Sequence, residues 1–182
     1  MSRLPAIDPA KLDASQRKVY DSIASGPRGG VRGPFLALIH VPELTNRIQH
    51  LGEYLRFNTA YPPRLSELAI IVTARHFNCQ YEWHAHAPLA VKGGLKQEIV
   101  DAIRDERRPR NMQADETAVY DFVSELVAHN KVSDAAYQRV TELFKISGAV
   151  ELAGLTGYYI MIAMTLLAHE VPLPAGTAPY WS

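Results

Sequence analysis

A chain of 182 residues has the length of one ordinary domain and can bury a substantial hydrophobic core. Its 19 basic and 19 acidic side chains leave no formal net charge, which argues against a nucleic-acid partner. The single cysteine, Cys79, excludes an intramolecular disulfide and therefore a secreted disulfide-framework domain.

The first half of the chain predicts helices that end at glycine and proline. Asp13 or Ser15 can cap a first helix, which stops at Gly26. Residues 25–34 hold four glycines and two prolines and predict a loop. A short helix is expected over residues 35–40, and Pro42 suits the first turn of the next one.

Two helices are expected in the middle of the chain. Arg64 or Ser66 opens the first, which carries regularly spaced apolar residues as far as Phe77. Asn78 is the expected N-cap of the second. Pro88 lies inside that helix and removes one backbone hydrogen bond, so we predict a kink or a break there.

The second half predicts further helices over residues 96–104, 114–130, 133–144 and 148–169, followed by an extended tail over 172–182. No segment alternates with the period of a strand, so the fold class is all-α, one single-domain helical bundle spanning 1–182.

Two terminal segments bear on location. Residues 1–11 lack the apolar stretch of a secretory signal, so we expect a cytoplasmic protein. The uncharged stretch 152–168 falls short of the ~20 apolar residues of a membrane-spanning helix. We interpret it as a helix that is buried in the core or in a subunit interface, and we expect no membrane partner.

One helix face gathers groups that can carry chemistry. Relative to Cys79, Glu82 lies about 60° and His86 about 20° to the same side. Cys79 falls in the first turn, where the helix dipole lowers the pKa of a thiol. Glu82 and His86 are four residues apart and can hydrogen-bond, which would hold the imidazole in one tautomer.

Glu67 lies among apolar residues on the preceding helix and could reach the same pocket for acid–base work. The alternative is that the Glu82–His86 pair is a solvated surface pair and Cys79 a small buried apolar residue. His84 and His86 point about 200° apart and cannot chelate one ion. Cys79, Glu82, His86 and Glu67 could surround a metal, but no metal motif of fixed helical spacing occurs, so we predict no metal.

The pattern of Glu67, Cys79, position 82 and His86 resembles the active-site motif of the alkylhydroperoxidase-D group, which is Glu, eleven residues, Cys-x-x-Cys, three residues, His. Glu67 matches the proton-relay glutamate, Cys79 the first cysteine and His86 the histidine. Glu82 stands in place of the second cysteine, so a cycle through an intramolecular disulfide is excluded.

Residues 26–174 more widely resemble the carboxymuconolactone-decarboxylase-like proteins, above all in the segment from Tyr81 to His84. The resemblance implies a bundle of the alkylhydroperoxidase-D-like type, a homo-oligomer (trimer or hexamer), a small-molecule substrate and no cofactor. Loss of carbon dioxide from a carboxylated unsaturated lactone needs only a stabilised dienolate and a proton donor. His86 would donate the proton, Glu82 would orient it, and Glu67 would be a second acid–base group.

The substrate carboxylate could be held bidentately by an arginine. For the arginines of the 25–34 loop, the alternative is a solvated turn. The residues expected to contact substrate are Tyr81, Trp83, His84, Arg28, Arg32 and Arg75.

Two other functions stay open at this stage. The first is a single-cysteine thiol peroxidase that uses Cys79 with an external thiol. The second is a non-catalytic, oligomeric helical binding protein. The chemistry around Cys79 and His86 separates all three.

Overall fold

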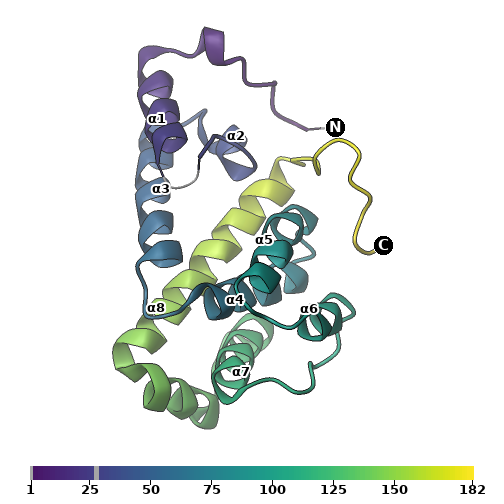
Figure 1. Ribbon diagram of the computed structural model, residues 1–182. Helices are drawn as coiled ribbons and strands as arrows, with labels where there is room; N and C mark the ends of the chain where they lie inside the picture. Colours follow the sequence, from purple (N-terminus) through teal and green to yellow (C-terminus); the bar gives the residue numbers. More distant parts are fainter. Residues whose placement is uncertain (1, 27–28) are drawn as a thin grey trace.

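The computed structural model describes residues 2–26 and 29–182, and all regular structure within these ranges is helical, which confirms the all-α class (Figure 1). A short 3-10 turn at Pro9–Lys11 comes first. The helices are α1 (Ala14–Ser25), α2 (Pro34–Leu38), α3 (Pro42–Phe57), α4 (Pro63–His76), α5 (Gln80–Lys92), α6 (Gln97–Arg104), α7 (Ala114–His129) and α8 (Asp134–Ala168).

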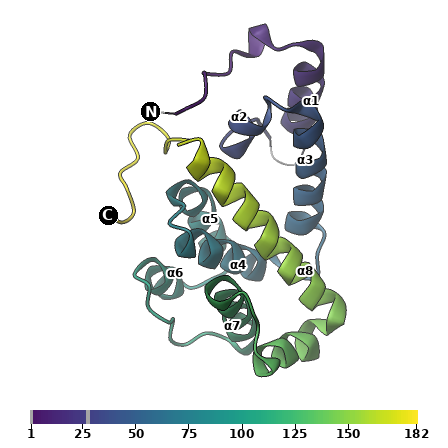
Figure 2. The same cartoon turned by 180° about the vertical axis from the view of Figure 1, so that it is seen from behind.

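The centre of the bundle is α4. Every residue from 65 to 74 is buried, because α5, α6, α7 and α8 all pack against this helix (Figures 1 and 2). A helix that is enclosed on all sides must be apolar around its circumference. Glu67 is the one ionisable residue in this buried run, and it therefore needs a partner inside the protein.

The predicted helix starts hold where a side chain caps the first turn. Asp13 forms a capping box with Gln16, and Ser133 accepts a hydrogen bond from the Ala136 amide. The predicted cap at Asn78 is wrong by one residue, because Cys79 occupies the N-cap position of α5. Asn78 instead takes a left-handed conformation, with φ of 52°, in the turn from α4, which asparagine tolerates better than most residues.

Of the predicted kink or break at Pro88, the break does not occur, because α5 runs continuously from Gln80 to Lys92. Pro88 is exposed. A carbonyl that loses its helical donor on the exposed side can be hydrated, so the ring need not end the helix.

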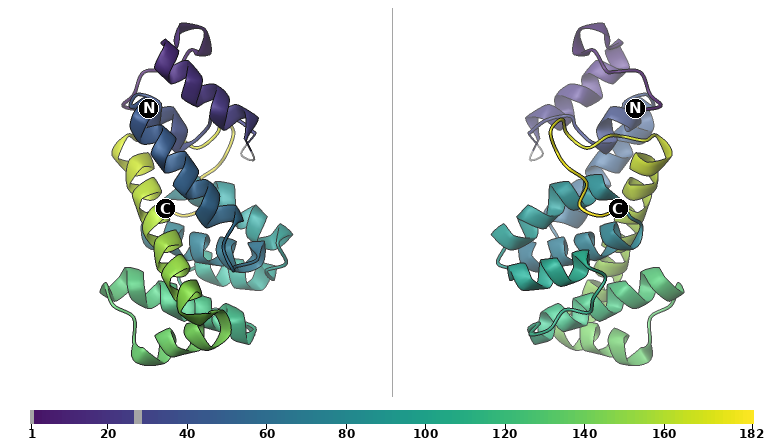
Figure 3. Two further views of the ribbon diagram at one scale, coloured as in Figure 1. Left: turned by 90° about the vertical axis from the view of Figure 1, so that its left-hand side faces the viewer. Right: turned by 90° about the vertical axis from the view of Figure 1, so that its right-hand side faces the viewer.

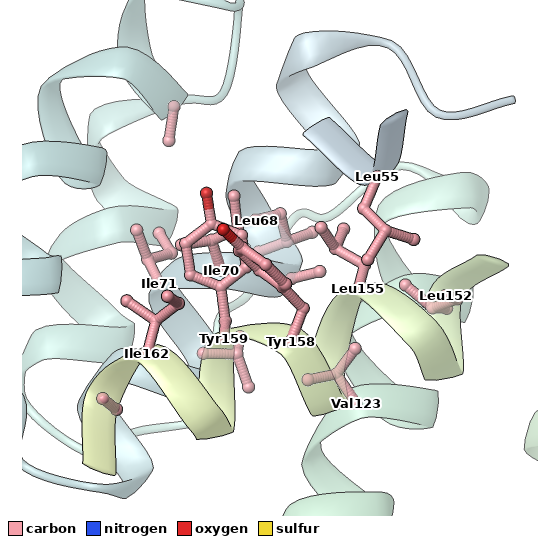
Figure 4. Packing of buried hydrophobic residues seen from close by; sticks show 14 of the residues in the cluster. Leu55, Leu68, Ile70, Ile71, Val123, Leu152, Leu155, Tyr158, Tyr159 and Ile162 are labelled. Carbon is pink, nitrogen blue, oxygen red and sulfur yellow. The ribbon is translucent and has the colours of Figure 1, made fainter. Parts of the chain in front are cut away.

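The last two predicted helices are joined in α8, whose backbone leaves helical geometry at Lys145. By length and composition α8 could cross a membrane. Its second half lies against the core, where Leu152, Leu155 and Ile162 are buried (Figure 4). Figure 4 also shows the Tyr158 and Tyr159 hydroxyl oxygens pointing the same way, off the α8 ribbon.

An ion cluster joins α4 to α7. The Arg64 guanidinium lies 2.6 Å from Asp115 Oδ2 and 2.5 Å from Glu116 Oε1, and Glu116 is only 1% exposed. The other Glu116 oxygen accepts from the Gln113 amide at 2.7 Å. One arginine thus pairs with two acids at the start of α7.

Both ends of the chain return to the body of the bundle. The Arg3 amide donates to the His169 carbonyl at 3.0 Å. The segment 171–182 has no regular structure and runs back along α5 (Figure 3, right). We call this segment the C-terminal strap.

Candidate active site

His86 lies between two carboxylates. Its Nδ1 is 2.5 Å from Glu67 Oε2, and its Nε2 is 3.7 Å from Glu82 Oε2. All three residues are at most 5% exposed. A carboxylate accepts hydrogen bonds, so Nδ1 is the donor to Glu67 in this contact, and this arrangement leaves Nε2 for chemistry.

Arg56 completes a buried ionic cluster. Its guanidinium lies 3.4 Å from the second oxygen of Glu67, and its side chain is 18% exposed. Two carboxylates and one guanidinium leave one negative charge, which an imidazolium at His86 would cancel. Buried charges are tolerated only when they are compensated in this way. Arg56 therefore compensates part of the carboxylate charge that surrounds His86.

The cluster opens on a cavity of about 430 Å³. Its wall comes from the loop before α2 and from α2, α3, α5, α8 and the C-terminal strap. The lining residues include Arg32, Gly33, Phe35, Arg56, Tyr81, Glu82, His84, His86, Leu89, Tyr158, Tyr159 and Pro174. This volume and mixed polar and aromatic lining suit a small molecule.

The structure gathers only some of the predicted residues. Tyr81, His84 and Arg32 line the cavity with Glu82 and His86, and Glu67 supports His86 from behind. His84 and His86 both reach the cavity although they are two residues apart. Among the described residues, no three His, Cys, Asp or Glu side chains are arranged to hold a metal ion.

Two of the predicted substrate contacts lie outside the cavity lining. Arg75 hydrogen-bonds the Arg104 carbonyl at 2.7 Å and stacks on the Trp181 ring at 4.5 Å. Trp83 is buried and packs edge-on against the same Trp181 ring. Both side chains therefore anchor the strap rather than line the cavity. Arg28, with Pro27, lies outside the described residues.

Cys79 is not among the cavity-lining residues. It is 1% exposed, and burial raises the pKa of the thiol to about 12 against the opposing effect of the Glu82 and Tyr81 backbone amides. The prediction of a lowered thiol pKa from the helix-start position is therefore wrong. Desolvation outweighs the backbone dipoles, so the thiolate is scarce near neutral pH.

Sequence reasoning missed Arg56, Tyr158 and Tyr159. The Tyr159 ring meets the His86 ring edge-on at a centroid distance of 5.0 Å. Burial, above all, raises the pKa of Tyr159 well beyond its ordinary value, and Glu82 and Glu67 add to this while Arg56 opposes it. The Tyr159 hydroxyl is therefore a neutral hydrogen-bond donor. The available signal was a pair of tyrosines in an otherwise apolar helix, since buried tyrosine hydroxyls usually find a polar partner.

Position 33 requires glycine for two reasons: its backbone conformation and the close approach of the Tyr81 ring. Its φ is +59°, and an added Cβ would lie 2.7 Å from the Tyr81 ring. We expect Gly33→Ala to lower the free energy of unfolding by about 1–3 kcal/mol in urea denaturation. Gly157→Ala is the matched control, because its Cβ would meet nothing within 4 Å and alanine favours helix. Equal stability of the two variants would contradict the steric role of Gly33.

The fold and site define an all-helical protein with a buried Glu–His–Glu cluster beside a small cavity. The Carboxymuconolactone decarboxylase family matches residues 42–125, the segment that carries Arg56, Glu67, Glu82 and His86. This match confirms the resemblance to that family over residues 42–125, and the solved structures below share the alkylhydroperoxidase-D-like fold. No curated protein matches the chain in sequence.

Solved structures share this fold at low sequence identity. A peroxidase-related protein with an alkylhydroperoxidase AhpD core from Ralstonia eutropha JMP134 has a TM-score of 0.78 and 18% identity, over 96% of this chain and 93% of that one. A peroxidase-related protein from Silicibacter sp. TM1040 has a TM-score of 0.74 and 16% identity, over 96% and 92%. The debrominase Bmp8, as a variant bound to 2,3,4-tribromopyrrole, has a TM-score of 0.75 and 12% identity, over 96% and 95%.

Proposed function

We propose that the protein is a cofactor-independent lyase that removes carbon dioxide from a small unsaturated carboxylic acid or lactone. One observation carries this proposal: His86 reaches the cavity between two carboxylates, while the only thiol lies buried outside the cavity lining. Both features support proton transfer rather than thiolate chemistry.

The reaction needs an electron sink and a proton. The bond between the substrate carbon and its carboxylate breaks, carbon dioxide leaves, and the electron pair delocalises into the conjugated carbonyl. His86 then donates the Nε2 proton to carbon and is reprotonated from water. The Tyr159 hydroxyl, kept neutral by burial, can donate to the enolate oxygen. Arg32 supplies positive charge to the cavity wall for the substrate carboxylate.

The test is a panel of small carboxylated lactones and unsaturated acids, incubated with the purified protein without added cofactor. Release of carbon dioxide from one member supports the lyase. Consumption of an organic hydroperoxide with a thiol donor, without carbon dioxide release, would support the single-cysteine peroxidase instead. Binding of panel members without turnover of either kind would favour the non-catalytic binding protein.

We also propose a homo-oligomer, a trimer or hexamer, in the cytoplasm. α3 and α8 lie side by side (Figure 3, left). Both helices carry large apolar side chains that are exposed, among them Leu51, Ile146 and Val150 at 52%, 68% and 65%. Exposed apolar faces of this kind usually mark an interface. Light scattering is expected to give a threefold or sixfold multiple of 20.3 kDa, and a dilute monomer would contradict this.

A further inference from the structure

The C-terminal strap is fastened to the start of α5. Gln80 Nε2 donates to the Trp181 carbonyl at 3.1 Å, and the Tyr180 amide donates to Gln80 Oε1 at 2.8 Å. The Trp181 ring is held by the edge of Trp83 and by the Arg75 guanidinium. This reciprocal amide pair and the two ring contacts fix the position of Tyr180.

Tyr180 in turn contacts a residue of the cavity. Its hydroxyl lies 2.7 Å from Nδ1 of His84, and His84 lines the cavity wall. Pro174 of the same strap also lines the cavity. The strap is therefore part of the site, although Tyr180 and His84 are 96 positions apart in the sequence.

The two cavity histidines have different partners on Nδ1. Glu67 can only accept, so His86 carries its proton on Nδ1 and offers Nε2 as the exchanging atom. The Tyr180 hydroxyl can donate to Nδ1 of His84, and His84 then carries its proton on Nε2. In that tautomer His84 is a fixed hydrogen-bond donor.

We propose that Tyr180 sets His84 as a neutral Nε2–H donor that binds a carboxylate oxygen of the substrate, with the C-terminal strap as the substrate-positioning wall. This inference rests on the cavity assigned under the proposed function and goes beyond it by naming, besides Arg32, a hydrogen-bond donor for the substrate carboxylate, which we call the binding arm. The two histidines lie on the same helix but have separate roles. His84 donates a hydrogen bond that binds the substrate, and His86 exchanges the proton. Tyr180 acts through His84 and is a positioning residue.

The test uses benzoate as the probe, because a small aromatic carboxylate reports on the binding arm without requiring turnover. Benzoate affinity is measured by NMR titration of the full chain, and the His84 tautomer is read from its imidazole ¹⁵N shifts. Tyr180→Phe keeps the ring but removes the hydroxyl. We expect it to weaken benzoate by about tenfold, the effect of one lost hydrogen bond, and to shift His84 away from the Nε2–H form.

Two further variants complete the comparison. His84→Gln should weaken benzoate at least as much as Tyr180→Phe. Tyr137→Phe, on a tyrosine 44% exposed on α8, is the matched control and should leave both readouts unchanged. Failure of the wild type to bind benzoate, or equal affinity in wild type, Tyr180→Phe and His84→Gln, would overturn the proposal. An unchanged His84 tautomer in Tyr180→Phe would overturn it as well.

The same data separate this proposal from the lyase. If benzoate binding and the tautomer shift behave as expected while no panel compound loses carbon dioxide, the binding arm stands and the lyase fails. If carbon dioxide is released but Tyr180→Phe leaves benzoate affinity and KM unchanged, the lyase stands and the role of Tyr180 is refuted.

Discussion

Replacing His86 with glutamine is expected to lower the kcat of decarboxylation by about 100- to 10,000-fold, the usual range for a lost general acid. Glutamine can still donate a hydrogen bond to Glu67, so the buried carboxylate keeps a partner and the fold is preserved. It cannot give up a proton to carbon. The rate of carbon dioxide release under saturating substrate measures the effect, and thermal unfolding checks that the variant is folded.

The matched control is Cys79→Ser. The lyase needs no thiol, and Cys79 is not among the residues that line the cavity, so most of the turnover should survive. Serine keeps the size but is a much poorer nucleophile and cannot form a sulfenate. If Cys79→Ser abolishes activity, His86→Gln spares it, and the wild type reduces hydroperoxide with a thiol donor, the peroxidase replaces the lyase.

Replacing Arg64 with alanine is expected to reduce the free energy of unfolding by about 3–5 kcal/mol, as when one partner of a buried ion pair is removed. Arg64 is the partner of both Asp115 and Glu116, and Glu116 is almost completely buried. Without the guanidinium, a charge stays in the protein interior between α4 and α7. Urea denaturation followed by circular dichroism measures the change.

Two comparisons make this result specific to the buried pair. Arg47→Ala removes an exposed helical ion pair with Glu43 and should cost less than about 1 kcal/mol. Adding Glu116→Gln to Arg64→Ala should recover part of the loss, because the unpaired charge is gone. If the Arg64 and Arg47 variants were equally stable, α4 and α7 would be held together by apolar packing alone.

Much of the helical framework could be predicted from the sequence, because helix starts and ends depend on neighbouring residues. Asp13 and Ser133 cap their helices as predicted. The fixed rotation per residue also placed Glu82 and His86 on one face of α5. The predictions of helix ends were wrong where a residue is compatible with more than one local conformation. Asn78 could cap a helix or turn left-handed, and Pro88 could break a helix or be accommodated on its exposed side.

The site itself depends on contacts that no local pattern contains. Arg56 lies close to Glu67 because α3 packs beside the core. Tyr159 lies close to His86 because α8 runs across the core. Tyr180 reaches His84 across 96 positions of sequence.

The all-helical class, most helix ends and the shared face of Glu82 and His86 were predictable from the residues alone, since these follow from backbone geometry and local capping. The raised pKa of Cys79 depends instead on the packing of the helices, because a thiol pKa responds to desolvation by side chains that are distant in sequence. The packing of the helices and the strap also determines that Arg32, and not Arg75, lines the cavity. Arg32 lines it, whereas Arg75 is turned to the C-terminal strap by Trp181.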